Sequence, residues 1–188
     1  MQGFIQYTEQ HTRVLHALNL DFLDNAIDIL CETIQTDGVI WVIGNGGSAS
    51  TASHASCDLS KGLSLSLDKR VRSFSLLDSL ATFTAWSNDF SYEEALRESC
   101  KINFRENDCL IAISGSGNST NILRAVEFAN QEEIPVISLL GFEGGLIGEI
   151  SKVPIVVKSD DMQVIENIHL TIIHWFLKAV SLRIIRGI

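Results

Sequence analysis

Two apolar segments, each ending in a loop of small residues, place the strongest constraint on how this chain can fold. The first is Val39–Ile43, followed by Gly44-Asn45-Gly46-Gly47-Ser48. The second is Cys109–Ile113, followed by Ser114-Gly115-Ser116-Gly117-Asn118-Ser119. Each segment is typical of a strand buried on both faces, and each loop is followed by a helical pattern. The chain therefore predicts two strand–loop–helix units whose loops flank one crevice of an open sheet.

The rest of the chain continues this alternation of strands and helices. Further strands are expected at Val71–Leu77, Pro135–Leu139 and Val153–Val157. Helices are expected at about 48–59, 79–87 (with Asp78 as N-cap), 92–104, 119–131, a short stretch opening at Gly144-Gly145, and 161–186, with 61–70 as a polar connection. The pattern predicts a doubly wound, flavodoxin-like α/β fold, in which helices flank five parallel strands.

The two ends of the chain predict helices that need a partner surface. Residues 4–35 carry apolar side chains at helical spacing, with a break at Asn19-Leu20-Asp21, where Asp21 is a candidate N-cap. The final helix, 161–186, is apolar almost all the way round, so most of its sides must be covered. We therefore expect a single domain over 1–188, with 1–35 as an oligomerisation segment, 36–188 as the core and C-terminal helix, and a homo-oligomer as the assembly.

Charge and hydropathy exclude several other classes of protein. The formal net charge of −9 argues against a nucleic-acid-binding surface, which needs clustered Lys and Arg. No uninterrupted apolar run reaches the ~18 residues that span a bilayer, and the N-terminus lacks a signal-peptide pattern. The expected location is the cytoplasm, with no nucleic-acid or membrane partner.

The two loops have the composition of an anion site. Backbone N–H groups and the positive end of a helix dipole converge at such a turn, and serine hydroxyls add donors that suit phosphate. A Walker A loop needs a lysine that neither loop has, and the dinucleotide fingerprint fits only loosely. Two tight turns without a ligand remain the alternative. Phosphate binding is the favoured interpretation.

Two groups of side chains are candidates for chemistry. His54 and Asp58 lie four residues apart, so they share one face of the helix after the first loop. Glu166, His169 and His174 lie on the final helix, where His169 is flanked by apolar residues and is expected to be a packing residue.

These motifs together resemble a known family. Gly44–Ser48, Ser87-Asn88-Asp89-Phe90, Ile113–Ser119 and Glu166-x-x-His169-x4-His174 occur in the order found in phosphosugar-binding SIS domains. The resemblance is strongest to the sedoheptulose-7-phosphate isomerase (phosphoheptose isomerase) branch, and it covers nearly the whole chain.

The resemblance implies an enzyme that interconverts a ketose phosphate and an aldose phosphate through an enediol, to supply heptose for surface polysaccharide. It implies tetramers with active sites between subunits, a divalent metal ion such as zinc, a general base at Asp58 and its acid/base partner at His174. The implied metal ligands are His54, Asp58, Glu166 and His174. The implied substrate-binding residues are Asn45, Gly46, Gly47, Ser48, Asn88, Asp89, Ser114, Gly115, Ser116, Ser119 and Glu166.

Three positions depart from the family pattern. Asp58 stands for the usual glutamate and reaches about one methylene less far, Glu166 stands for a glutamine and adds a negative charge, and Gly115 stands where a threonine is common. Glu166 and His174 are also separated by about 12 Å of helix rise, which makes a common ligand harder to share. Two alternatives stay open: a non-catalytic SIS protein that binds a phosphosugar or a replication initiator, and an isomerase of a different sugar phosphate.

Overall fold

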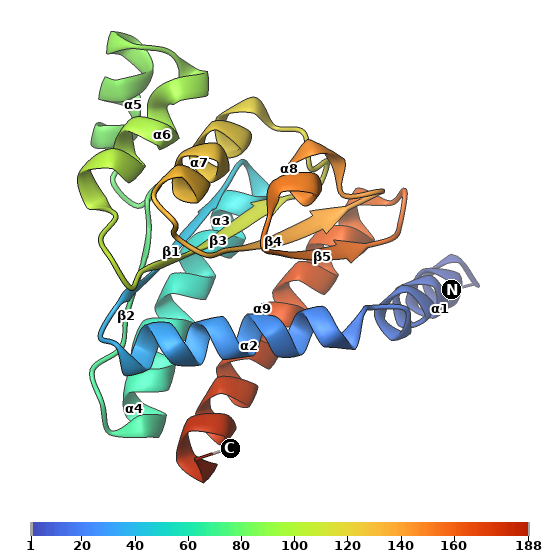
Figure 1. The fold of residues 1–188 in the computed structure, drawn as a ribbon. Helices are drawn as coiled ribbons and strands as arrows, with labels where there is room; N and C mark the ends of the chain where they lie inside the picture. The colour runs from blue at the N-terminus through green and yellow to red at the C-terminus, as the bar shows by residue number, and fades with distance from the viewer. Residues whose placement is uncertain (1, 188) are drawn as a thin grey trace.

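A computed structural model describes residues 2–187, and it contains one parallel five-stranded sheet (Figure 1). The strands are β1 (Val39–Gly44), β2 (Arg72–Ser75), β3 (Cys109–Ser114), β4 (Val136–Gly141) and β5 (Val153–Val157), in the order β2-β1-β3-β4-β5. Neighbouring strands pair in parallel throughout, for example Trp41 with Leu110 and Ile111 with Ile137. The order reverses between β1 and β3, which is where an open sheet of this kind binds ligands. The predicted fold class is confirmed.

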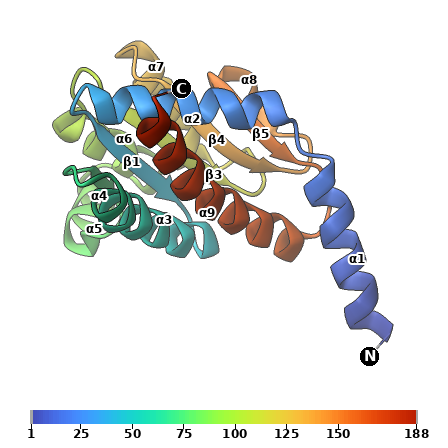
Figure 2. The same cartoon turned by 90° about the horizontal axis from the view of Figure 1, so that it is seen from below.

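Helices cover both faces of the sheet, and each face has its own apolar core (Figures 1 and 2). One face carries α2 (Leu20–Gln35), α3 (Gly47–Cys57), α4 (Leu63–Leu67) and α9 (Met162–Arg186). The other face carries α6 (Tyr92–Asn103), α7 (Thr120–Gln131) and α8 (Gly145–Ile150), and α5 (Leu80–Asp89) packs against α6. The helices that follow β1 and β3, α3 and α7, therefore lie on opposite faces.

The N-terminal helices are present as predicted, but the residue that caps the second one is different. Asn19, not Asp21, is the N-cap of α2, and its Oδ1 accepts hydrogen bonds from the backbone N–H groups of Asp21 and Phe22. The helix before it, α1 (Gln2–His16), has no buried residue and projects from the body of the molecule (Figure 2).

Two local predictions between β1 and α5 were wrong. Residues 61–70 are not only a polar connection: α3 continues through a π-helical turn, Asp58–Gly62, into α4. Leu59 and Leu63, four residues apart, are both fully buried, and this packing outweighs the local glycine and serine content. Ser79 rather than Asp78 caps α5, with its hydroxyl accepting from the Thr82 backbone N–H at 3.4 Å.

The last helix, α9, is long and apolar enough by composition to cross a membrane, although it contains no uninterrupted apolar run of that length. Its most apolar 18-residue window has a mean hydropathy of 1.4, and 33% of that window is buried. The core helix of a soluble protein passes the same test. Ile165, Ile168, Ile172 and Phe176 lie in the core beneath the sheet, so one side of α9 is a packing surface of this fold.

Candidate active site

The loop after β1 brings a carboxylate to the start of α3. Gly46 adopts φ 53° and ψ −119°, a conformation that side chains disfavour, and α3 begins at Gly47. A Cβ atom at Gly47 would lie 2.7 Å from Glu166 Oε1 and 2.8 Å from Oε2. Glycine is thus needed at position 47 because the Glu166 carboxylate, from α9, rests against the α3 N-terminus.

The loop after β3 is folded by its own serine hydroxyls. Ser114 Oγ accepts a hydrogen bond from the Gly117 N–H at 3.2 Å, and Ser116 Oγ accepts one from the Asn118 N–H at 3.2 Å. Ser114 Oγ also donates to Ser119 Oγ at 3.4 Å. Gly117 has φ 67°, and a Cβ atom there would lie 2.0 Å from the Gly144 carbonyl oxygen. Hydroxyls and backbone N–H groups therefore gather in one tight turn at the start of α7.

The two loop helices differ from α2, α5, α6 and α9 in how they begin. Side chains of Asn19, Ser79, Ser91 and Asp161 cap α2, α5, α6 and α9. Over the described residues, α3 and α7 have no side-chain hydrogen bond at their N-caps, Gly46 and Ser119. An uncapped N-terminus at the end of a strand leaves backbone donors and the positive end of the helix dipole for an anion.

An amide network joins the two loops. Asn45 Nδ2 donates to Asn121 Oδ1 at 2.8 Å, and Asn121 Nδ2 donates back to Asn45 Oδ1 at 2.8 Å. The Tyr92 hydroxyl, from α6, also donates to Asn45 Oδ1 at 3.0 Å. Asn45 Oδ1 thus has two donors, while its Nδ2 group carries a second N–H that is available to a ligand.

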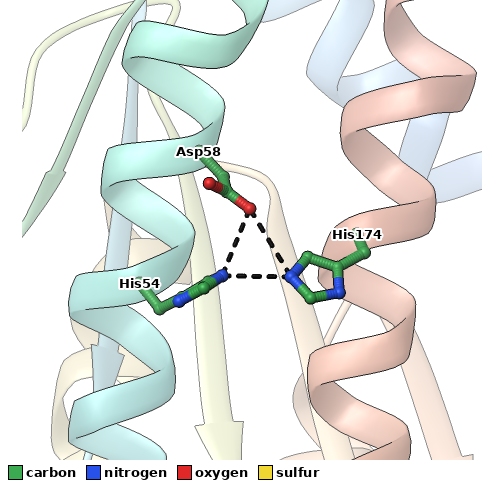
Figure 3. Close-up of side chains that lie close together, drawn as sticks. All are labelled: His54, Asp58 and His174. Carbon is green, nitrogen blue, oxygen red and sulfur yellow. Dashed lines mark hydrogen bonds and ion pairs between the residues drawn. The ribbon is translucent and has the colours of Figure 1, made fainter.

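Three side chains from α3, the π-turn and α9 converge on one point (Figure 3). His54 Nε2 lies 3.0 Å from His174 Nε2, and Asp58 Oδ2 lies 3.2 Å from His54 Nε2 and 3.6 Å from His174 Nε2. The side chains of His54, His174 and Asp58 are 47%, 49% and 29% exposed, respectively, so the cluster is open to solvent in one chain.

The spacing of these three atoms fits a metal ion. Tetrahedral zinc with bonds of about 2.0–2.1 Å holds its ligand atoms about 3.3 Å apart, close to the three separations observed. Two imidazole nitrogens and a carboxylate oxygen are also ligands that zinc accepts, with a fourth position left open for substrate. His54, Asp58 and His174 are thus a competent three-ligand set.

The remaining predicted site residues are spread around this cluster. Glu166 lies at Gly47 and is not part of the three-residue group. Asn88 and Asp89, at the end of α5, are exposed and bonded to each other, with Asn88 Nδ2 donating to Asp89 Oδ1 at 3.0 Å. Gly115 is buried, and a Cβ atom there would lie 2.5 Å from Met162 Sδ, so Met162 fills the space next to it.

His169 is a packing residue in this structure. It is fully buried, and its Nε2 bonds to the Leu140 carbonyl oxygen at 3.1 Å. Burial lowers the pKa of His169 to about 4, so its imidazole is neutral near pH 7.

Sequence reasoning missed two residues of the site, Asn121 and Tyr92. Asn121 follows the second loop by two residues, but its burial is known only from the structure, and an asparagine in the first turn of a helix gives no signal by itself. Tyr92 gave no signal either, because α6 reaches the loops only through its packing in the second core, on the face of the sheet opposite α3.

Comparisons with known proteins agree with this fold. An SIS domain family model matches residues 4–141, so the chain belongs to the SIS domain family. It is 36% identical to a phosphoheptose isomerase of Helicobacter pylori over 171 residues, which cover 91% of this chain and 88% of that protein. A phosphoheptose isomerase of Campylobacter jejuni is 34% identical over 147 residues, 78% of each chain.

A solved structure shows the same similarity in three dimensions. A phosphoheptose isomerase from Francisella tularensis superimposes with a TM-score of 0.86 at 26% identity, over 96% of this chain and 95% of that one. The similarity therefore extends beyond the family model to α9, which carries His174.

Proposed function

We propose that this protein is an aldose–ketose isomerase that interconverts sedoheptulose 7-phosphate and glycero-manno-heptose 7-phosphate. The cluster of His54, Asp58 and His174 carries the proposal, because a pure phosphosugar binder has no need of three such ligands at 3.0–3.6 Å. The names of the relatives from Helicobacter pylori and Campylobacter jejuni support the reaction and the seven-carbon substrate.

The phosphate is assigned to the loop after β3. Ser116 and Ser119 present hydroxyls there, next to the uncapped N-terminus of α7. The hydrogen bonds that now fold the loop also show that its hydroxyls reach its backbone donors, so both kinds of group can turn to one phosphate. Ser48, Asn88 and Asp89 are assigned to the sugar hydroxyls, with the backbone of Gly46, Gly47 and Gly115 lining the loops.

The proton transfer is assigned to Asp58 and His174. Asp58 takes a proton from C1 of the ketose and returns it at C2 of the enediol, while His174 carries the hydroxyl proton from O1 to O2 when its Nε2 is not occupied by a metal ion. Asp58 Oδ2 faces the two imidazoles, and the second carboxylate oxygen points away from both rings (Figure 3). We assign the role of base to that second oxygen.

His54, Asp58 and His174 would hold a divalent metal ion, and their two imidazoles and one carboxylate favour zinc. Once bound, it would polarise the oxygens on C1 and C2. Glu166 would join only by turning from the α3 N-terminus toward the cluster. With its carboxylate against Gly47, Glu166 is assigned to the sugar.

Metal binding is tested without any turnover. Zinc at 100 times its Kd stabilises the folded state by about 2.7 kcal/mol, which raises the melting temperature of a chain of this size by about 5–10 °C. His54→Ala should abolish this shift, whereas His16→Ala, on the projecting α1, should keep it. A wild-type protein whose melting temperature does not respond to zinc contradicts the metal assignment.

The phosphate assignment is tested by two serine substitutions. Ser116→Ala with Ser119→Ala should raise the KM for sugar phosphate about tenfold or more, since each removes a hydrogen bond to a charged group. Ser66→Ala, on exposed α4, is the control and should leave KM unchanged. An unaltered KM in the double variant contradicts the assignment.

The assembly is proposed to be a homo-oligomer, a tetramer by the resemblance, acting in the cytoplasm. The first two helices and α9 border an apolar cavity of about 400 Å³, and Trp175 at its rim is 48% exposed. Phe4 and Ile5 on α1 are 72% and 55% exposed. A second copy would cover these apolar surfaces and the open cluster between α3 and α9, with 1–35 as the oligomerisation segment.

Sedimentation tests the assembly. Trp175→Glu should reduce the oligomer to a smaller species, while Leu146→Glu, an exposed leucine on α8 across the sheet, should not. A wild-type protein that sediments as a single chain contradicts the proposal.

A further inference from the structure

We infer that Asn121 and Tyr92 are positioning residues that fix the distance between the two loops, and thereby the length of sugar phosphate that reacts. The inference rests on the proposed function, which places the phosphate at the start of α7 and the reacting carbons between α3 and α9. It concerns the residues that keep the phosphate site and the reacting carbons at a fixed distance from each other.

The sheet holds the ends of β1 and β3 together, with Gly44 opposite Ile113, but this pairing does not extend to the helix starts beyond the two loops. The loops follow β1 and β3, which are neighbours, but α3 and α7 depart to opposite faces. Ala52 and Ala55 of α3 lie in one core, and Ile122 and Ala125 of α7 lie in the other. Packing of one helix on the other therefore does not set the distance between their starts.

The amide pair supplies this link. Asn45 lies two residues before α3 begins, and Asn121 is the second residue of α7. Two reciprocal hydrogen bonds of 2.8 Å join them, and Asn121 is 1% exposed. An amide pair of this kind is directional and satisfies both groups, so the two helix starts are held in one relative position.

Tyr92 extends the link to a third element. Its hydroxyl donates to Asn45 Oδ1 at 3.0 Å, and its ring packs edge-on against Phe83 of α5, with centroids 5.8 Å apart. The α5–α6 pair carries Asn88 and Asp89, which are assigned to the sugar. The network thus relates the phosphate loop, the first loop and the sugar-binding helix end to one another.

The consequence for the reaction is selection by chain length. A sugar phosphate one carbon shorter, with its phosphate on α7, places its reacting carbons roughly 1 Å or more from the required point, and a misplacement of that size costs about 100-fold in rate. Loosening the network should impose this penalty on the seven-carbon substrate and change the rates of the shorter substrates, which already carry it, little.

Asn121→Ala and Tyr92→Phe test the inference against seven-, six- and five-carbon ketose phosphates. For the seven-carbon substrate, kcat/KM should fall about 10- to 100-fold through kcat, while the shorter substrates change little, so discrimination narrows. The inhibition constant of inorganic phosphate should stay within about twofold, because the phosphate loop itself is intact. Tyr92→Phe removes one exposed oxygen and keeps the ring, so it provides a folded variant if Asn121→Ala is unstable.

Asn130→Ala is the matched control. Asn130 lies on α7 like Asn121 but away from the loops, and the substitution removes a 2.8 Å amide hydrogen bond to the Ile150 carbonyl of α8. It should lower the melting temperature without altering discrimination. Affinities of the same sugar phosphates, measured by calorimetry, report the distance between the two loops even where no substrate is converted. Wild-type selectivity in both variants, or an equal loss for all substrates, overturns the inference. A wild-type protein that binds these compounds selectively but converts none overturns the proposed function instead.

Discussion

Acidification should destabilise this protein through His169, by an amount that the structure sets. The buried imidazole has a pKa of about 4, against about 6.5 in an unfolded chain. Below pH 6.5 the imidazole of the unfolded chain takes up a proton before that of the folded chain. The stability that the neutral, buried His169 contributes above pH 6.5 is therefore lost as the pH falls toward 4. The shift corresponds to a loss of about 2 kcal/mol between pH 7 and pH 5, and about 3 kcal/mol by pH 4.

Urea denaturation at several pH values, for wild type and His169→Gln, measures this loss. The glutamine amide keeps a donor for the Leu140 carbonyl but does not titrate. All other titratable groups are common to the two proteins, so the difference between the two pH profiles isolates His169. The variant should lose about 2 kcal/mol less than wild type between pH 7 and pH 5. Parallel profiles for the two proteins would refute the reasoning.

Three further predictions concern the helix starts. Asn19→Ala should lower the free energy of unfolding by about 1 kcal/mol in urea, because it removes the cap of α2, and an unchanged midpoint would contradict that role. Gly117→Ala should impair phosphate inhibition and stability together, because φ 67° and the nearby Gly144 carbonyl leave no room for a methyl group; normal inhibition would count against the loop geometry. Glu166→Gln should cost about 0.3–1 kcal/mol of stability at low salt and less at 1 M salt, since the carboxylate lies at the α3 N-terminus; a salt-independent effect would exclude the dipole as its cause.

The centre of the sheet could be read from the sequence because β1, β3 and β4 are buried on both faces. Val39–Ile43 and Cys109–Ile113 are apolar runs bounded by glycine and serine, and such runs have few alternatives to a central parallel strand. The caps were harder because neighbouring residues, Asn19 and Asp21 or Asp78 and Ser79, are all good N-caps. Only the backbone path selects one of them.

The site was predictable where residues share a helix and not where they meet across the fold. The four-residue spacing of His54 and Asp58 places them on one face. His174, 120 residues away from His54, was expected beside them only from the family resemblance, and no local pattern indicated the 3.0 Å approach that the structure shows. The Asn45–Asn121 pair depends on β1 and β3 being neighbours in the sheet. Strand order is a tertiary property, and no local pattern in the sequence encodes it.

The most direct test of the account is turnover of sedoheptulose 7-phosphate by the purified protein. Assays with added zinc, with chelator, and with Asp58→Asn or His174→Gln should show conversion by the wild type with zinc and a loss of at least about 100-fold in either variant. Both variants should still be inhibited by inorganic phosphate, since the loop after β3 is unchanged. No conversion by the wild-type protein under any metal condition would contradict the central claim.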